Sequence, residues 1–152
     1  MTSKALQDCL PKGSPFRECF GCGADNPQGL RIKSYLEGDR AVCRFRPEAH
    51  HLAAPGMVNG GILATLIDCH GIWTAVGLSL RKEGASAGQD TSGVFVTRKL
   101  TVEYLKPAPT GLEIVLVGKI TAQSQRSVTV TVDLSAGDET VARGEVVAVR
   151  VM

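Results

Sequence analysis

The sequence predicts an α+β fold in which one long helix packs on one antiparallel sheet of about six strands. Three observations support this prediction: a single long apolar segment of helical character from Asn59 to about Lys82, two strand-like segments before it, and four strand-like segments after it. Because the helix has only one sheet on which to bury its apolar side, helix and sheet must form two layers of one domain.

Residues 1 to about 29 are rich in Gly, Pro and Cys and end in "DNPQG", which predicts an irregular lead-in closed by a turn. The segments "LRIKSYLE" and "RAVCRFRP" follow as two short strands, and Gly38 and Asp39 between them predict a hairpin. We therefore expect a lead-in over residues 1–29 and a single domain over residues 30–152.

A Gly- and Ser-rich loop, "EGASAGQDTSG", separates the helix from the last four strands. These strands are expected in "VFVTRKLTVEYLKP", "LEIVLVGKITAQ", "RSVTVTVDLSA" and "TVARGEVVAVRVM". The third alternates clearly, with Val128, Val130, Val132 and Leu134 on one face and Thr129, Thr131 and Asp133 on the other.

Composition and charge narrow the class of protein. Seventeen Lys and Arg stand against fifteen Asp and Glu in 152 residues, and no basic block is interleaved with aromatic residues, so we expect no nucleic-acid partner. The amino terminus lacks a signal-peptide core, and Asp68, His70 and Gly71 interrupt the longest apolar runs, so we expect no membrane span. These features predict a cytoplasmic protein.

Five cysteines, an odd number at irregular spacing, favour a reduced compartment over a disulfide framework. Cys19 and Cys22 in "CFGC" have the spacing of half a zinc site or of a redox pair. No second CxxC and no His-x-x-x-His follows to complete four ligands. We therefore expect a tight turn with small buried thiols, no bound metal and no cofactor.

The predicted helix has two faces of different character. One is large and apolar, as expected for a face that lies on a sheet, and comprises Ile62, Leu66, Cys69 and Trp73. The other is made of small residues around one carboxylate, and comprises Ala64, Asp68, Gly71 and Ala75. Small residues admit another backbone or a ligand, which favours a functional Asp68 over a merely solvated one.

The helix start is the second candidate element of a site. Asn59 is a favourable N-cap residue, and Gly60 and Gly61 place unhindered backbone N–H groups at the positive end of the helix dipole. Such a helix start stabilises an anion or a developing oxyanion. Glycine pairs at helix starts also serve simple turns, so this pattern alone leaves both interpretations open.

Three motifs, "PGMVNGGILATLID", "CFGCGADNPQGL" and "TVEYLKPAPTG", together resemble the PaaI-type acyl-CoA thioesterases of the hotdog fold, within the 4-hydroxybenzoyl-CoA thioesterase superfamily. The resemblance runs from about Cys19 to the carboxyl end. It implies that Asp68 is the catalytic carboxylate and that the Gly60 N–H polarises the thioester carbonyl. It also implies that Thr97 helps to place the attacking water. Asn59 stands where relatives have a histidine, which puts catalytic efficiency in question.

The resemblance implies an acyl-CoA substrate, hydrolysed with Asp68 acting as general base or as nucleophile. The phosphate-rich tail of coenzyme A suggests Arg98, Lys99 and Arg126 as partners, although basic residues on strands are often only solvated. Gly61 and His51 are further candidates for contact with the substrate, with an ordinary loop role as the alternative for His51.

Two other functions remain open from the sequence. The first is a non-catalytic acyl-CoA sensor, in which the absent histidine marks lost activity. The second is a hydratase on the same fold, although the Asp and His pair close together at the helix start that such sequences use is absent here. The sequence does not identify the acyl group.

Gly60 and Asp68 are eight residues apart, which corresponds to roughly 12 Å along a helix, too far to act on one carbonyl. Two antiparallel helices side by side would bring Gly60 of one subunit opposite Asp68 of the other. We therefore expect a homodimer with composite active sites, alone or as part of a dimer of dimers, as the resemblance also implies.

Overall fold

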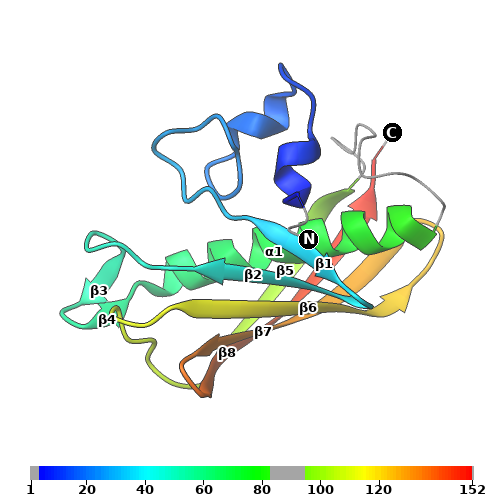
Figure 1. Cartoon of the computed structure of the whole chain (residues 1–152). Helices are drawn as coiled ribbons and strands as arrows, with labels where there is room; N and C mark the ends of the chain where they lie inside the picture. The colour runs from blue at the N-terminus through cyan, green and yellow to red at the C-terminus, as the bar shows by residue number, and fades with distance from the viewer. Residues whose placement is uncertain (1–3, 83–94, 152) are drawn as a thin grey trace.

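The computed structural model describes residues 4–82 and 95–151, and its main elements are one long helix and one six-stranded antiparallel sheet (Figure 1). The helix is α1 (Gly60–Lys82). In order across the sheet, the strands are β1 (Ser34–Glu37), β2 (Arg40–Phe45), β6 (Ile114–Gln123), β7 (Ser127–Ala136), β8 (Glu139–Arg150) and β5 (Phe95–Tyr104). This arrangement confirms the predicted α+β fold of one helix on about six strands.

The strand pattern of the sequence is confirmed most clearly in β7. Its side chains alternate between buried and half-buried, and the buried set is the predicted one of Val128, Val130, Val132 and Leu134. The β1–β2 hairpin also forms as predicted, with Gly38 at its turn in the left-handed region at φ 64°. A glycine adopts that conformation without the steric cost that a side chain would add.

Several short elements were not expected. The lead-in contains two single-turn 3₁₀ helices, η1 (Leu6–Cys9) and η2 (Pro15–Glu18). Strands β3 (Leu52–Ala54) and β4 (Met57–Val58) form a small separate sheet just before α1. Segments of two to four residues carry too little periodicity to be recognised in a sequence. The predicted Gly- and Ser-rich loop lies outside the described residues.

Glycines allow α1 to lie very close to the sheet. A Cβ atom at Gly144 of β8 would stand 2.3 Å from Ile67 Cγ2, and one at Gly71 of α1 would stand 2.5 Å from Val146 Cγ2. No side chain fits at either position. Ala75, on the same predicted small-residue face as Gly71, is fully buried.

The predicted division of helix faces is therefore wrong in part. Gly71 and Ala75 are buried inside this chain and cannot face a partner helix, whereas Ala64 and Asp68 remain half-buried. The lead-in stands over the helix on the side away from the sheet (Figure 1), so the second half of α1 is covered on nearly all sides. An enclosed helix segment has no solvent face for the sequence pattern to reveal.

Residues Gly60–Arg81 are long and apolar enough to cross a membrane, since the mean hydropathy of an 18-residue window within them is 1.4. However, 61% of that window is buried inside the protein. Burial against the sheet accounts for the apolar character, because a core helix passes the same test.

His70 of α1 is fully buried in a polar network that connects four elements. Its Nε2 lies 3.0 Å from the carbonyl oxygen of Ala41, which can only accept, so Nε2 carries the proton. Nδ1 then accepts from Ser34 Oγ at 2.8 Å, and Ser34 Oγ in turn accepts from Gln7 Nε2 at 3.0 Å. Burial lowers the pKa of His70 to about 4, so the ring is neutral at pH 7.

We expect this buried histidine to make the protein less stable in mild acid. The unfolded chain binds a proton near pH 6.5 and the folded chain only near pH 4, so stability is fully present above 6.5 and falls as the pH drops toward 4. Urea unfolding at pH 7.5 and 4.5 should show a loss of about 2 kcal/mol from this group.

His70→Gln should remove this loss of unfolding free energy between pH 7.5 and 4.5. His50→Gln, at a side chain that is 73% exposed, should show the same loss as the wild-type protein. An unchanged pH dependence in the His70 variant would contradict the assignment.

Candidate functional site

Asn59 forms the N-cap of α1, as predicted. Its Oδ1 accepts hydrogen bonds from the backbone N–H groups of Gly61 at 2.7 Å and Ile62 at 3.3 Å. A Cβ atom at Gly61 would lie only 2.9 Å from Asn59 Oδ1, so the glycine makes room for the cap. The side-chain oxygen of Asn59 is thus committed to the helix start.

Gly60, the first residue of α1, has a backbone N–H for which the described residues provide no acceptor. Its carbonyl oxygen accepts a hydrogen bond from Tyr104 Oη at 2.7 Å. The two residues line one side of an open pocket with Met57, Leu63 and Lys106. Sequence reasoning missed Tyr104, which lies in the recognised "TVEYLKP" segment but carries no spacing signal. A helix-start N–H that opens on a pocket can stabilise an oxyanion.

Asp68 lies on the half-buried side of α1, about two turns further along. Thr97 of β5 donates a hydrogen bond from Oγ1 to Asp68 Oδ1 at 2.6 Å. The pairing of β5 with β8 shifts register between Thr97 and Lys99, which leaves Arg98 as the extra residue of a β-bulge. The structure therefore brings together Asp68 and Thr97, two of the four predicted catalytic residues.

A pocket of about 200 Å³ opens beside Asp68 and Thr97. Its other walls are mainly apolar and aromatic, and comprise Phe16, Cys19, Cys22, Cys69, Ile72, Trp73, Val76, Phe95 and Val96. Trp73 and Phe95 both line this pocket while being largely buried. A carboxylate at the mouth of an apolar pocket is suited to act on an apolar group bound inside it.

Gly60 and Asp68 line different pockets of the same chain. Eight residues of helix separate them, which is about 12 Å along the axis. One chain alone therefore presents an N–H donor and a carboxylate that do not converge on one atom.

The predicted substrate-contacting residues lie in less central places. The His51 side chain is buried outside both pockets, where Nδ1 accepts from the Glu48 N–H at 3.0 Å, and burial lowers its pKa. Its carbonyl oxygen accepts from the Asn59 N–H at 2.8 Å, so His51 supports the helix start. Arg98 is exposed in the β5 bulge beside Thr97.

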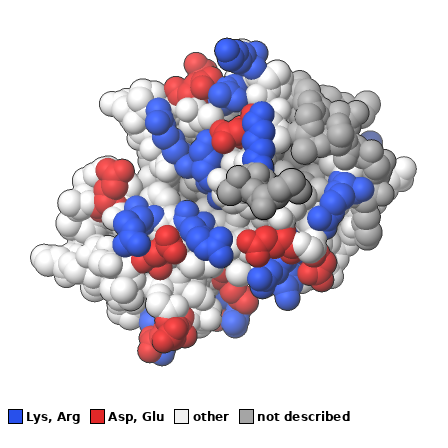
Figure 2. Space-filling view, viewed as in Figure 1, with Lys and Arg blue, Asp and Glu red and all other residues white. Residues whose placement is uncertain are grey.

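Arg126 is exposed in the turn between β6 and β7, and its carbonyl oxygen accepts from the Arg150 N–H at 2.8 Å. The Arg150 guanidinium lies 5.0 Å above the ring of Phe95, which lines the pocket beside Asp68. Arg126 is therefore near the pocket end of the sheet. On the face shown in Figure 2, basic and acidic side chains are interspersed, without a patch of one sign.

Three cysteines form a cluster on the wall of the same pocket. The sulfur atoms of Cys19, Cys22 and Cys69 all lie within 4.8 Å of one another, and the Cys19 and Cys69 sulfurs are 4.0 Å apart. The third thiol comes from α1, fifty residues after Cys19, where no CxxC or His-x-x-x-His spacing indicates it. In the described part of the chain, this is the one group of three such side chains placed to hold a metal ion.

The thiols of the cluster differ in acidity. Hydrogen bonds from the Cys22 and Cys69 thiols, and from the backbone N–H groups of Cys22 and Gly21, lower the pKa of Cys19. Donation to Cys19 raises the pKa of Cys22 to about 11 and holds the pKa of Cys69 well above its usual range. Trp73 Nε1 also donates to Cys22 Sγ at 3.3 Å.

Comparison with known proteins places this site in a family. The sequence profile described as "Thioesterase superfamily" matches residues 55–143, which include Asn59, Gly60, Asp68 and Thr97. Acyl-coenzyme A thioesterase THEM4 of Xenopus laevis is 29% identical over 109 residues, 72% of this chain. The chain spans only 43% of the length of that relative.

Two solved structures show the same fold. A thioesterase superfamily protein from Shewanella loihica PV-4 is 38% identical with a TM-score of 0.65, over 80% of this chain and 91% of that one. The PaaI protein of E. coli, from the phenylacetic acid degradation operon, has a TM-score of 0.65 at 17% identity, over 81% of each chain. The likeness to PaaI proteins that the motifs indicated is thus confirmed in the fold, and the profile covers more than half of the chain. The protein belongs to the thioesterase superfamily.

Proposed function

We propose that the protein is an acyl-CoA thioesterase that hydrolyses a thioester to a free acid and coenzyme A. The observation that carries this proposal is the Asp68 carboxylate, which is hydrogen-bonded by Thr97 and stands at the mouth of an apolar pocket. The acyl-coenzyme A thioesterase THEM4 relative supports the substrate class.

Asp68 acts as the general base in this proposal. The hydrogen bond from Thr97 occupies Oδ1 and leaves Oδ2 to accept a proton from water. The water oxygen attacks the thioester carbonyl, and the negative charge that develops on the carbonyl oxygen is stabilised by the Gly60 N–H. The C–S bond then breaks, and the thiolate of coenzyme A takes up a proton as it leaves. A preorganised N–H of this kind contributes about 3 kcal/mol to such a reaction.

The acyl group occupies the pocket beside Asp68. Phe16, Ile72, Trp73 and Phe95 on its walls favour an apolar chain or an aromatic ring over a charged acyl group. Arg98 and Arg126, exposed near the same end of the sheet, are placed to meet the phosphates of coenzyme A.

A second copy of the chain completes the site. Strand β5 is an edge strand that pairs only with β8 among the described strands, and it exposes Val96, Leu100 and Tyr104. An unpaired edge of ten residues is a template for pairing with another strand. In this proposal β5 pairs antiparallel with β5 of the partner subunit.

The contacts of β5 then explain how the two half-sites meet. Thr97 near one end of β5 binds Asp68, and Tyr104 at the other end binds Gly60. An antiparallel pair centred between Leu100 and Thr101 sets each Thr97 end beside the Tyr104 end of the partner subunit. Asp68 of one chain thereby approaches the Gly60 N–H of the other, as an isologous dimer requires.

Asp68→Asn should lower kcat for acyl-CoA hydrolysis by about 10²–10⁴-fold, because the amide keeps the shape but cannot take a proton. The rate of hydrolysis is measured by the release of free thiol from a panel of aliphatic and aromatic acyl-CoAs. Asp138→Asn, in an exposed turn, is the matched control and should keep full activity. Near-normal turnover in the Asp68 variant would refute the mechanism, and wild-type protein that binds acyl-CoA without releasing thiol would identify a sensor.

Asn59 should act mainly through its cap. Asn59→Ser keeps an oxygen that can cap the helix, so the variant should retain its free energy of unfolding and stay within about tenfold of normal activity. Asn59→Ala should lose about 1 kcal/mol of stability in urea unfolding. A loss of activity above a hundredfold in a stable Ser variant would show instead that the Asn59 amide contacts the substrate.

Mixed dimers test the composite site. An Asp68→Asn chain and a Gly60→Pro chain are each expected to be inactive. Random pairing after co-refolding gives about half heterodimers, each with one intact site, and so about a quarter of wild-type activity. Proline is well tolerated at the first position of a helix, where it removes the N–H.

Gly60→Ala is the control for the proline, since it keeps the N–H and its added Cβ would only touch the Tyr104 ring at 3.4 Å. This variant should retain most activity. Heterodimers that are demonstrated by mass spectrometry but remain inactive would show that the two residues do not share a site across subunits.

A further inference from the structure

The turn that carries Cys19 and Cys22 is pressed against the helix that carries Cys69. A Cβ atom at Gly21 would stand 2.3 Å from Cys69 Sγ, and one at Gly23 would stand 2.4 Å from the backbone nitrogen of Cys19. The Gly23 N–H donates to the Cys19 carbonyl at 2.8 Å and closes the turn. Both glycines are therefore required for the turn to bring its thiols onto Cys69.

The sulfur positions are close to those of a tetrahedral metal centre. Zinc–sulfur bonds of about 2.3 Å at tetrahedral angles separate the sulfurs by about 3.8 Å. The Cys19 and Cys69 sulfurs are already 4.0 Å apart, and no pair in the cluster exceeds 4.8 Å. Contraction by at most about 1 Å, within the reach of side-chain rotation, would bring all three sulfurs to bonding distance.

We propose that Cys19, Cys22 and Cys69 bind one zinc ion as three thiolates, with the fourth coordination position facing the pocket beside Asp68. All three residues line that pocket, so an exogenous ligand such as water can reach the metal. Binding displaces the thiol protons that remain on the three ligands and leaves a site with a net charge of −1. This proposal revises the expectation of no metal that followed from the incomplete ligand pattern.

The surroundings of the cluster suit a thiolate-bound cation. The Trp73 indole N–H already donates to Cys22 Sγ at 3.3 Å, and such outer hydrogen bonds orient a ligand and stabilise its negative charge. Soft thiolate ligands select zinc over calcium or magnesium. The ion would join the lead-in to α1 directly beside the proposed catalytic carboxylate.

Zinc content tests the proposal without reference to catalysis. Protein purified in reductant and without chelator should contain one zinc per chain by elemental mass spectrometry. Cobalt added to the reduced apoprotein should give intense thiolate-to-cobalt charge-transfer bands and the visible bands of a tetrahedral ion. Cys19→Ser and Cys69→Ser should each weaken zinc binding by more than about a hundredfold, since even outer partners of a metal site contribute ten- to a hundredfold.

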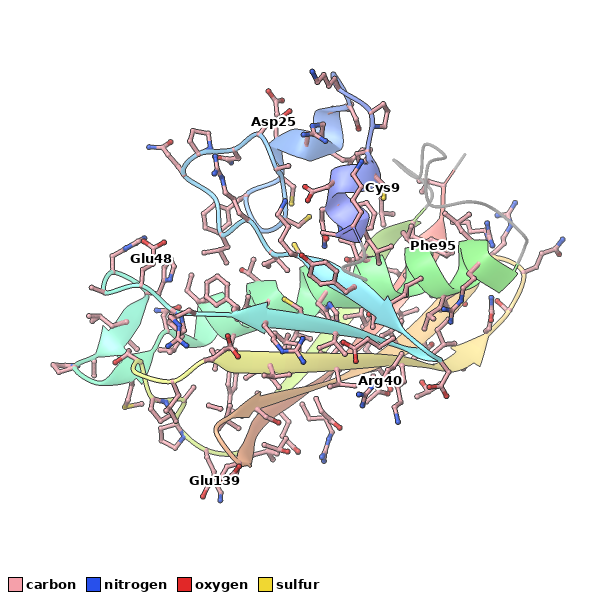
Figure 3. The ribbon with its side chains drawn as sticks, in the orientation of Figure 1. Cys9, Asp25, Arg40, Glu48, Phe95 and Glu139 are labelled. Atoms are coloured by element: carbon pink, nitrogen blue, oxygen red, sulfur yellow. The ribbon has the colours of Figure 1, made fainter. Side chains whose placement is uncertain are left out.

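Cys9→Ser is the matched control, because Cys9 is a half-buried thiol in η1 of the same lead-in (Figure 3) and is not part of the cluster. It should keep the zinc and the cobalt spectrum. Zinc should also raise the Tm of wild-type and Cys9→Ser protein but not that of Cys69→Ser. If that last variant fails to fold, Cys19→Ser gives the same comparison.

Three outcomes would overturn the proposal. The first is reduced wild-type protein that binds neither zinc nor cobalt at one equivalent per chain. The second is an equal loss of metal in Cys9→Ser. The third is an intact mass in reductant that corresponds to a disulfide between two of the three cysteines. None of these outcomes alters the expected loss of hydrolysis in Asp68→Asn, so the two proposals fail separately.

Discussion

The close approach of α1 to the sheet is the constraint on which the site depends. The helix can approach so closely because the sheet has glycines opposite the larger side chains of α1. A Cβ atom at Gly144 would meet Ile67 at 2.3 Å, and one at Gly118 would meet Thr74 Oγ1 at the same distance. An added methyl group there would overpack the interface, at a cost of about 1–3 kcal/mol, or push the helix outward. The depth at which α1 lies sets which of its side chains reach β5, the lead-in and the hairpin.

Three consecutive helix residues show the consequence. Asp68 reaches Thr97 of β5, Cys69 meets the turn of the lead-in, and His70 enters the network with Ser34 and Ala41. Successive side chains on a helix point about 100° apart, so neighbours in sequence serve three different surfaces. The proposed catalytic carboxylate thus lies between a strand that orients it and a cysteine turn that closes its pocket.

Much of this could be predicted from residues that act locally. The alternation in β7, the cap at Asn59 and the glycines after it are short-range patterns. They located the strands and the helix start correctly, and they indicated the Gly60 N–H as a candidate donor. Asp68 was a candidate functional residue because a carboxylate inside an apolar helix is costly to bury without a partner.

What could not be predicted depends on contacts between distant segments. Cys69 joins Cys19 across fifty residues, and Tyr104 reaches Gly60 across forty-four. No short motif or regular spacing in the sequence indicates either contact. The assignment of helix faces failed at Gly71 and Ala75 for a related reason: glycine and alanine mark a close approach, but not whether the approaching group belongs to the same chain or to another.

Two of the contacts that hold the lead-in to the domain end at Cys69 and His70, directly after Asp68 in the sequence. These two contacts are the Gln7 and Ser34 hydrogen bonds that end at His70, and the sulfur cluster at Cys69, beside which Trp73 also donates to Cys22. The ion pair between Arg17 and Asp25, at 2.8 Å, lies within the lead-in and fixes only its internal shape. Phe16 and Cys19 of the lead-in line the pocket that α1 and β5 leave open. If the proposed function holds, the space for an acyl group is set by how the lead-in sits on α1, and the two anchors act on specificity although neither would touch the reacting carbonyl.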